Sequence, residues 1–103
     1  RHLGASLKMA RTKAISTQRE VILAIDVQNH SFSLLKKKKS LNLPEGSKII
    51  LNTAKSEQLS DTEGAFRFFP DGSSTGGRIT LRHDPSRYFI DINWLPGKVT
   101  ISP

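Results

Sequence analysis

The sequence contains no cysteine among its 103 residues. The lack of thiols excludes a disulfide framework, a cysteine-ligated zinc site and a thiol nucleophile. Aromatic residues make up only 7% of the chain, and the hydrophobic fraction is 36%. A chain of this length still buries about two thirds of its unfolded surface on folding, which is enough for one core. We therefore expect a single small domain with a thin core.

Long hydrophobic runs are also missing. No apolar stretch approaches the roughly 20 residues that cross a bilayer, and no segment has the charged start, apolar middle and small-residue cleavage site of a signal peptide. The chain begins with Arg1 rather than methionine. We expect the natural protein to carry further sequence upstream.

Acidic residues are scarce compared with basic ones. Lysine and arginine number 16 and aspartate and glutamate 9, giving a formal net charge of +7. This balance favours polyanions, acidic partners or anionic membrane surfaces. The run Lys36–Lys39 could bind phosphates, with Arg78, Arg82 and Arg87 as further contacts. It could instead be a solvated turn, or an edge strand whose lysines prevent another strand from pairing with it. No aromatic residues interleave with the lysines to stack bases, which favours the second interpretation.

The histidines do not form a catalytic or metal-binding pattern. They are His2, His30 and His83, and no two of them lie three or four residues apart, as helical zinc ligands do. His83 adjoins Asp84, but no nucleophile-elbow motif accompanies the pair. We interpret the pair as a strand end beside a turn, and we expect no catalytic residue.

The glycine-rich stretch Asp71–Arg78 is also interpreted as structural. It lacks the repeated acidic positions and the closing glutamate of a calcium loop. It also lacks the Lys-Ser/Thr end of a phosphate-binding loop, and it leads into a strand rather than a helix. We therefore expect neither a metal nor a cofactor.

Hydrophobic spacing near 3.6 predicts a helix from Arg1 to about Gln18. Its apolar stripe, which would seat the helix on the rest of the domain, consists of Leu3, Leu7, Ala10 and Ala14. No N-cap signal precedes Leu3, so we expect this to be the C-terminal part of a longer helix.

After Arg19 the spacing changes to two, which predicts strands. About seven are expected, and the better defined ones cover Val21–Gln28, Ser31–Leu35, Lys48–Ala54, Phe66–Phe68, Ile79–His83, Tyr88–Trp94 and Val99–Ile101. Lys55–Gly64 is polar and is expected to be a loop. The fold class is therefore α+β, an N-terminal helix (1–18) packed on the antiparallel sheets or β-sandwich of a β-rich part (19–103).

The segment Phe66–Leu81 (FRFFPDGSSTGGRITL) resembles the signature of the H-type minor pseudopilins of type II secretion and the related minor pilins, the GspH/FimT-type family. Two further pieces, Ala10–Ile15 and Arg19–Val21, resemble the part of the family in which the helix leads into the first strand, and Tyr88–Ile101 resembles the C-terminal part of the family. The signature loop would be shaped by Phe68, Pro70, Asp71, Gly72, Gly76 and Gly77. Asp71 is expected to accept hydrogen bonds from nearby amides, and Gly72 to adopt positive φ.

The resemblance implies a structural subunit rather than an enzyme. Such a subunit assembles with other minor subunits at the tip of a pseudopilus or type IV pilus and can touch secreted substrate. A prepilin peptidase would first remove a leader from the N-terminus. An upstream apolar helix would then anchor the subunit in the bacterial inner membrane, with this domain in the periplasm. Partner contacts are expected on the exposed start of the helix and on the loops.

The alternative is a DNA-binding minor pilin of natural competence. That branch carries a Gly-Arg-x-Arg pattern near its end, where this sequence has Gly97-Lys98-Val99-Thr100, with one basic residue in place of two. The DNA contacts in this alternative would be Lys36, Lys37, Lys38, Lys39, Arg78 and Lys98.

Overall fold

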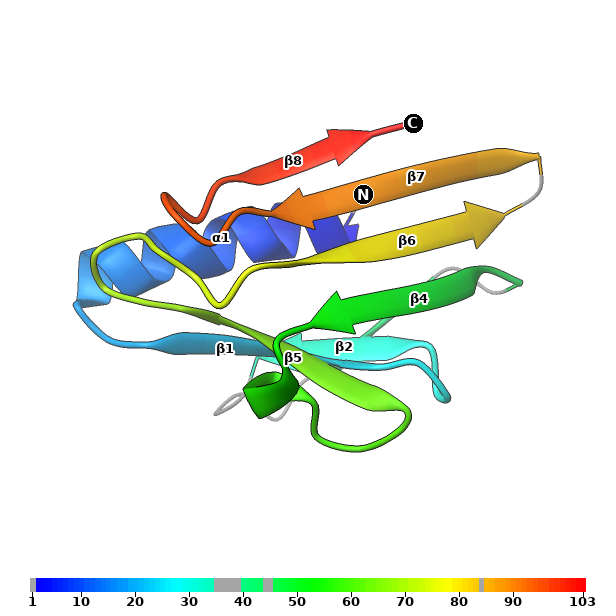
Figure 1. Ribbon diagram of the computed structural model, residues 1–103, viewed down its shortest axis with the longest axis horizontal. Coiled ribbons are helices and arrows are strands. Elements are labelled where there is room, and N and C mark those ends of the chain that lie inside the picture. Colours follow the sequence, from blue (N-terminus) through cyan, green and yellow to red (C-terminus); the bar gives the residue numbers. More distant parts are fainter. Residues whose placement is uncertain (1, 35–39, 44–45, 84) are drawn as a thin grey trace.

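The computed structural model describes residues 2–34, 40–43, 46–83 and 85–103. In these residues the chain forms one α-helix, one short 3-10 helix and two four-stranded sheets (Figure 1). All the strand pairings within the two sheets are antiparallel. The expected α+β class, with an N-terminal helix on antiparallel sheets, is confirmed.

The two sheets divide the strands between them. The first has the order β3-β2-β1-β5 and consists of β1 (Val21–Asp26), β2 (Ser31–Leu34), β3 (Ser40–Asn42) and β5 (Glu63–Phe68). The second has the order β4-β6-β7-β8 and consists of β4 (Lys48–Thr53), β6 (Gly77–His83), β7 (Ser86–Ile92) and β8 (Val99–Ser102).

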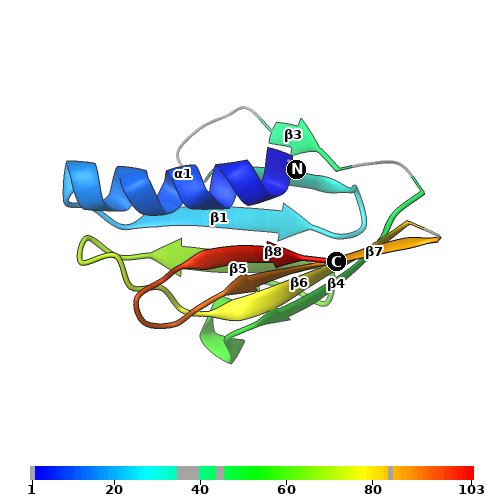
Figure 2. The same ribbon diagram turned by 90° about the horizontal axis from the view of Figure 1, so that it is seen from above.

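Helix α1 (His2–Thr17) packs on both sheets. It contacts β1 and β5 of the first sheet and β8 of the second. Figure 1 shows α1 behind β7 and β8, and Figure 2 shows it running along β1. The stripe predicted from the spacing points into the core, where Leu3, Leu7, Ala10 and Ala14 are each at most 1% exposed.

Small residues let α1 approach the sheets closely. A Cβ atom built on Gly4 would lie 2.4 Å from Cδ1 of Ile101 in β8, which is closer than real Cβ contacts come. Ala10 and Ala14, which are fully buried, also add little side-chain volume to the packed face further along the helix. The helix therefore lies tightly on the domain because its buried face has little side-chain volume.

The end of α1 is set by a left-handed residue. Gln18 has φ of +55°, and the Arg19 amide donates a 3.3 Å hydrogen bond to the Ala14 carbonyl. This is the long bond of a Schellman motif, which satisfies a carbonyl that the helix end leaves without a partner. The chain then enters β1 directly.

The core lies between the inner faces of the two sheets and the helix. The inward-facing side chains follow the alternation predicted for the strands. Those that are at most 6% exposed come from both sheets and include Leu23, Ile25, Phe66, Phe68, Ile49, Ile79, Ile90, Ile92 and Val99. One continuous cluster thus joins the helix to both sheets.

The predicted strands differ from the observed ones in number and in extent. Ser40–Asn42 forms an additional strand, β3, which pairs with β2, so the described residues hold eight strands instead of about seven. The polar segment 55–64 is not only a loop, because it contains the 3-10 helix η1 (Lys55–Glu57) and the start of β5 at Glu63. Leu35, the expected end of the second strand, lies outside the described residues.

Two strands end earlier than the alternation predicts. β1 stops at Asp26, whose carboxylate accepts hydrogen bonds from the backbone N–H and the side-chain amide of Asn29, at 3.1 and 2.7 Å. These bonds hold the chain in an Asx turn. β7 ends at Ile92, and one further bond, from the Asn93 amide to the Lys98 carbonyl, closes the turn that leads into β8. Trp94 therefore lies in a turn and not in the strand.

Replacing Leu7 with alanine tests the contribution of the helix face. Leu7 is fully buried, so Leu7→Ala should lower the free energy of unfolding by about 2–5 kcal/mol through lost burial and a residual cavity. Met9→Ala is the matched control on the same helix, since Met9 is 65% exposed. Urea unfolding of both variants measures the difference, and similar losses would contradict the placement of the helix.

Candidate assembly site at the end of the helix

Two loops meet near the C-terminal half of α1. The signature loop, residues 69–76, joins β5 to β6, and the closing turn, residues 93–98, joins β7 to β8. Ser74 links them, because its amide donates to the Trp94 carbonyl at 2.9 Å and its hydroxyl donates to the Asn93 carbonyl at 2.7 Å. The same hydroxyl accepts the Gly76 amide at 3.0 Å. Ser74 is 1% exposed, so it is a buried polar group with its hydrogen bonds made.

The bend of the signature loop is built by Asp71 and Gly72. One carboxylate oxygen of Asp71 accepts the Ser73 backbone N–H at 2.9 Å and the Ser73 hydroxyl at 2.6 Å. The hydroxyl bond, and after it the backbone bond, lowers the pKa of Asp71 below its ordinary value. Gly72 has φ of +92°, a left-handed conformation that side chains disfavour.

Arg11 of the helix binds both loops. Its Nε donates to the Gly72 carbonyl and to the Pro96 carbonyl, each at 3.1 Å. These acceptors lie in the signature loop and in the closing turn, so a single guanidinium joins three segments of the chain. Because an arginine cation donates to neutral carbonyls here, each bond is charge-assisted.

The two loops approach each other too closely for a side chain between them. A Cβ built on Gly97 would lie 1.9 Å from the Gly72 carbonyl oxygen, and Gly97 has φ of +80°. A Cβ on Gly72 would lie 3.0 Å from Nη2 of Arg11. Glycine is required at position 97 on both grounds, the contact and the backbone conformation.

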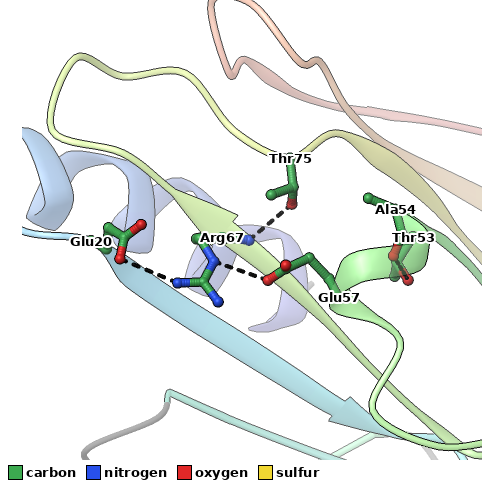
Figure 3. Close-up of polar contacts among 6 residues, drawn as sticks. All are labelled: Glu20, Thr53, Ala54, Glu57, Arg67 and Thr75. Atoms are coloured by element: carbon green, nitrogen blue, oxygen red, sulfur yellow. Dashed lines mark hydrogen bonds and ion pairs between the residues drawn. The ribbon is translucent and has the colours of Figure 1, made fainter.

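The other end of the signature loop is fixed to β5 through Arg67. Two hydrogen bonds link Arg67 and Thr75. The Arg67 amide donates to the Thr75 side-chain hydroxyl at 3.1 Å, and the Thr75 amide donates to the Arg67 carbonyl at 3.0 Å. The Arg67 guanidinium lies between Glu57 and Glu20, at 3.0 and 3.2 Å (Figure 3). Glu57 is 7% exposed, and a carboxylate this buried needs a charged partner. The hydrogen bond to Glu57 is the main cause of the raised pKa of Arg67.

The closing turn presents two large apolar side chains to solvent. Trp94 is 71% exposed and Leu95 is 66% exposed. We call these two residues the apolar tip. Exposed aromatic and aliphatic side chains on a rigid support are typical of protein–protein contact sites. The apolar tip therefore offers an exposed apolar surface next to the two bonded loops.

The chain matches known proteins over nearly its whole length. The model of the family described as type II transport protein GspH matches residues 1–95. The type II secretion system protein H of Xanthomonas campestris pv. campestris is 33% identical over 101 residues, which cover 98% of this chain and 59% of the relative. This chain therefore spans less than two thirds of that protein. The chain belongs to the GspH family.

Solved structures show the same fold at low sequence identity. The minor pseudopilin EpsH of Vibrio cholerae superposes with a TM-score of 0.74 at 13% identity, covering 98% of this chain and 90% of that one. The type IV minor pilin FimU of Pseudomonas aeruginosa superposes with a TM-score of 0.73 at 15% identity, covering 99% and 84%. The resemblance drawn from the signature segment is confirmed, and so is the pilin-like fold.

The residues expected to shape the signature loop of this GspH-family chain lie together around it. Phe68 is fully buried at the end of β5, and Pro70 is half-buried. Gly76 and Gly77 have φ of +75° and +141°. A Cβ on Gly77 would lie 2.2 Å from the Asn52 carbonyl oxygen of β4. The four stripe residues are buried inside the domain, so they seat the helix and do not themselves reach a neighbouring subunit.

Of the basic residues of the DNA-binding alternative, the structure describes Arg78 and Lys98. Arg78 bonds to Asp91 at 2.6 Å, and its guanidinium lies over the ring of Phe89, 5.0 Å from the centroid. Lys98 is exposed in the closing turn. Lys36–Lys39 lie outside the described residues. Arg78 is thus already engaged, and the comparisons do not favour DNA binding.

In the described part of the chain, the histidines and acidic residues form no group of three or more that could hold a metal ion. No described helix is long and apolar enough to cross a membrane. Asp84, the acidic neighbour of His83, lies outside the described residues.

The sequence pattern alone did not reveal four parts of this site: Arg11, Ser74, the Glu57–Arg67 pair and the apolar tip. Arg11 contacts residues 61 and 85 positions away, which no local spacing indicates. Trp94 was included in a strand because it continues the alternation of Ile90 and Ile92. The Leu95-Pro96-Gly97 turn was the one local signal that could have placed it outside the strand.

Replacing Arg11 with methionine should loosen both loops. Arg11→Met keeps the aliphatic stem and removes the bonds to Gly72 and Pro96, so we expect a loss of about 1–2 kcal/mol in the free energy of unfolding. Lys8→Met, at an exposed position of the same helix, is the control and should change it by less than about 0.5 kcal/mol. Equal effects in urea unfolding would mean that Arg11 does not join the loops.

The Asp71 carboxylate should titrate below its ordinary pKa. The folded-state pKa is lowered, so the stabilisation is present above the unfolded pKa and is lost as the pH falls through the folded value. Ser73→Ala removes the hydroxyl donor and should return the pKa toward the ordinary value, whereas Ser86→Ala should leave it unchanged. Carboxyl NMR titration measures both, and an unshifted pKa in the unmodified protein would contradict the bend as described.

Proposed function

We propose that this chain is the periplasmic domain of a minor pseudopilin of type II secretion, and that it acts by assembly with other minor subunits at the tip of the fibre. The proposal is supported by the GspH family match over residues 1–95 and by the relative named type II secretion system protein H. The solved structures of EpsH and FimU support the fold but, at 13% and 15% identity, not the choice between a pseudopilus and a pilus.

The observation that carries a binding role is the apolar tip on its rigid base. Trp94 and Leu95 are exposed, while the backbone that holds them is bonded to Ser74 and Arg11. A side chain that is presented by a fixed backbone loses little conformational entropy when it is buried in a complex. Aromatic anchors of this kind contribute most of the binding energy in many interfaces. We propose that the apolar tip inserts into a neighbouring minor subunit.

The membrane attachment belongs to the same proposal. Members of this family would be anchored in the bacterial inner membrane by an apolar helix that continues into α1. In that arrangement the domain lies in the periplasm, and assembly rather than catalysis is its activity. Contact with secreted substrate is proposed only through the assembled tip.

Affinity for the sibling minor pseudopilins tests the proposal. The purified domain should capture at least one sibling subunit in a pull-down. Trp94→Ala and Leu95→Ala should each weaken that binding about tenfold or more, because each truncates an exposed apolar anchor. Melting temperatures close to that of the unmodified protein would show that the variants fold.

Leu59→Ala is the matched control, since Leu59 is 54% exposed on a different loop. It should bind siblings as the unmodified domain does. Failure to capture any sibling would count against the assembly role. Capture that is equally strong in all three variants would keep the assembly role but remove the apolar tip from it.

A further inference from the structure

Strand β4 forms a free edge of the second sheet, since β6 is the one described strand that pairs with it. The Asn52 carbonyl points toward β6, where a Cβ built on Gly77 would collide with it. Successive residues of a strand direct their backbone groups to opposite edges. Ile49, Leu51 and Thr53 therefore direct their N–H and C=O groups away from β6. Among the described residues, no backbone hydrogen bond outside the two sheets reaches these groups.

The edge of β4 lacks the usual protection against strand pairing. Proteins protect such edges with charged side chains, proline, bulges or a covering segment. After Lys48, β4 reads Ile-Ile-Leu-Asn-Thr, without charge or proline, and Ile50 is 46% exposed. The neighbouring edge strand β5 is instead closed near both ends, by isolated bridges at Gly64 and Phe68. The edge of β4 is thus suited to pair with a further strand.

A hollow of about 430 Å³ runs along this edge. One wall is residues 49–53 of β4, and the facing wall is formed by Gln58 and residues 60–64, with Val27 of the β1–β2 turn beside them. Figure 1 shows β4 and β5 drawing apart toward the start of β5. An added strand would lie about 4.8 Å from β4. The hollow therefore lies where such a strand would run.

The charge at the hollow is negative, although the chain has a formal net charge of +7. Asp61 and Glu63 are the charged residues of its described lining, and the ion pairs between described residues use other carboxylates. Asp26 lies directly opposite Glu63 in the register of β1 with β5. The backbone hydrogen bond from Asn29, and after it the side-chain bond, lowers the pKa of Asp26. Like charges directly opposite each other are destabilising, so a cation at this position would relieve the repulsion.

We propose that the free edge of β4 binds an extended segment of another protein that carries lysine or arginine at alternate positions. The segment would pair with the free backbone groups of β4. Its cations would lie toward Asp61 and Glu63, and its intervening apolar side chains would cover Ile50. In this mode of recognition the main-chain bonds supply affinity and the alternate side chains supply specificity. The surface uses no residue of the apolar tip and goes beyond the proposed assembly role.

Hydrogen exchange followed by NMR tests the free edge in the domain alone. The amides of Ile49, Leu51 and Thr53 should exchange faster than those of Ile50 and Asn52, which face β6. A peptide in which lysines alternate with valine and threonine should shift the three outward amides and slow their exchange. Equal exchange of all five amides in the free domain would contradict the edge as described.

Two altered peptides separate backbone pairing from charge attraction. The first keeps the lysines but is N-methylated at the alternate residues that would face β4, so it cannot donate to the edge. The second carries glutamate in place of each lysine. Each should bind at least about tenfold more weakly than the lysine peptide, the first because main-chain bonds are lost and the second because its charge is repelled.

Paired variants of the domain locate the charge contact. Asp61→Asn with Glu63→Gln should weaken binding of the lysine peptide about tenfold. Ala5→Lys with Ser16→Lys raises the net charge by the same two units at exposed positions of α1, and should weaken binding less than about threefold because salt screens distant charges. Melting temperatures show whether the variants fold, and Asp61→Asn alone replaces the first pair if it does not.

Four results would overturn the proposal. They are no binding of the lysine peptide, equal losses in the two paired variants, equally tight binding of the N-methylated peptide, and self-association of the domain through the same three amides without peptide. The last result would assign the edge to a second copy of this chain. Sibling subunits are not needed in any of these experiments, so their failure leaves the assembly proposal untouched.

Discussion

The packing of one narrow helix face is the constraint on which the rest of the structure depends. The two sheets are separate hydrogen-bonded units, and α1 contacts β1 and β5 of one and β8 of the other. Its buried described residues are two leucines, two alanines and Gly4, and Gly4 lies close to Ile101. A larger side chain at Ala10 or Ala14, which are fully buried, would overpack the core under the helix.

The other residues of the helix extend this role from the core to the loops. Arg11 borders the buried stripe and reaches the carbonyls of Gly72 and Pro96. Ser74, which is buried, makes the second connection between the same loops through its hydrogen bonds to the closing turn. The positions of Trp94 and Leu95 thus follow from contacts that begin on α1. An exposed apolar side chain on a mobile loop would lose conformational entropy on binding. Because these contacts already order the backbone of the turn, less entropy remains to be lost.

Local features of the fold could be predicted from the sequence because local physics determines them. The helical stripe, the alternation in Lys48–Thr53 and the break of β5 before Pro70 each depend on neighbouring residues. The Asp71–Gly72 bend is also local, since its bonds come from Ser73. The short strand Ser40–Asn42 was missed because three residues carry too little alternation to be recognised.

Contacts between distant residues could not be predicted in this way. The partners of Arg11 are fixed by the docking of the helix, and the exposure of Trp94 by the early end of β7. The pairing of Lys48 with Arg82 is a case of the same kind, since these residues become neighbours only through the register of β4 with β6. The run Lys36–Lys39, which is conspicuous in the sequence, lies outside the described residues.

Site-specific photo-crosslinking in cells tests the central claim most directly, namely that the end of the helix carries a protein-binding tip. A photoreactive amino acid would replace Leu95 in the full-length protein, and Leu59 in a parallel strain. The account predicts a crosslink from position 95 to another minor subunit when the secretion system is assembled, and none from position 59. Crosslinks from position 59 alone, or none from position 95 in a functioning system, would contradict it.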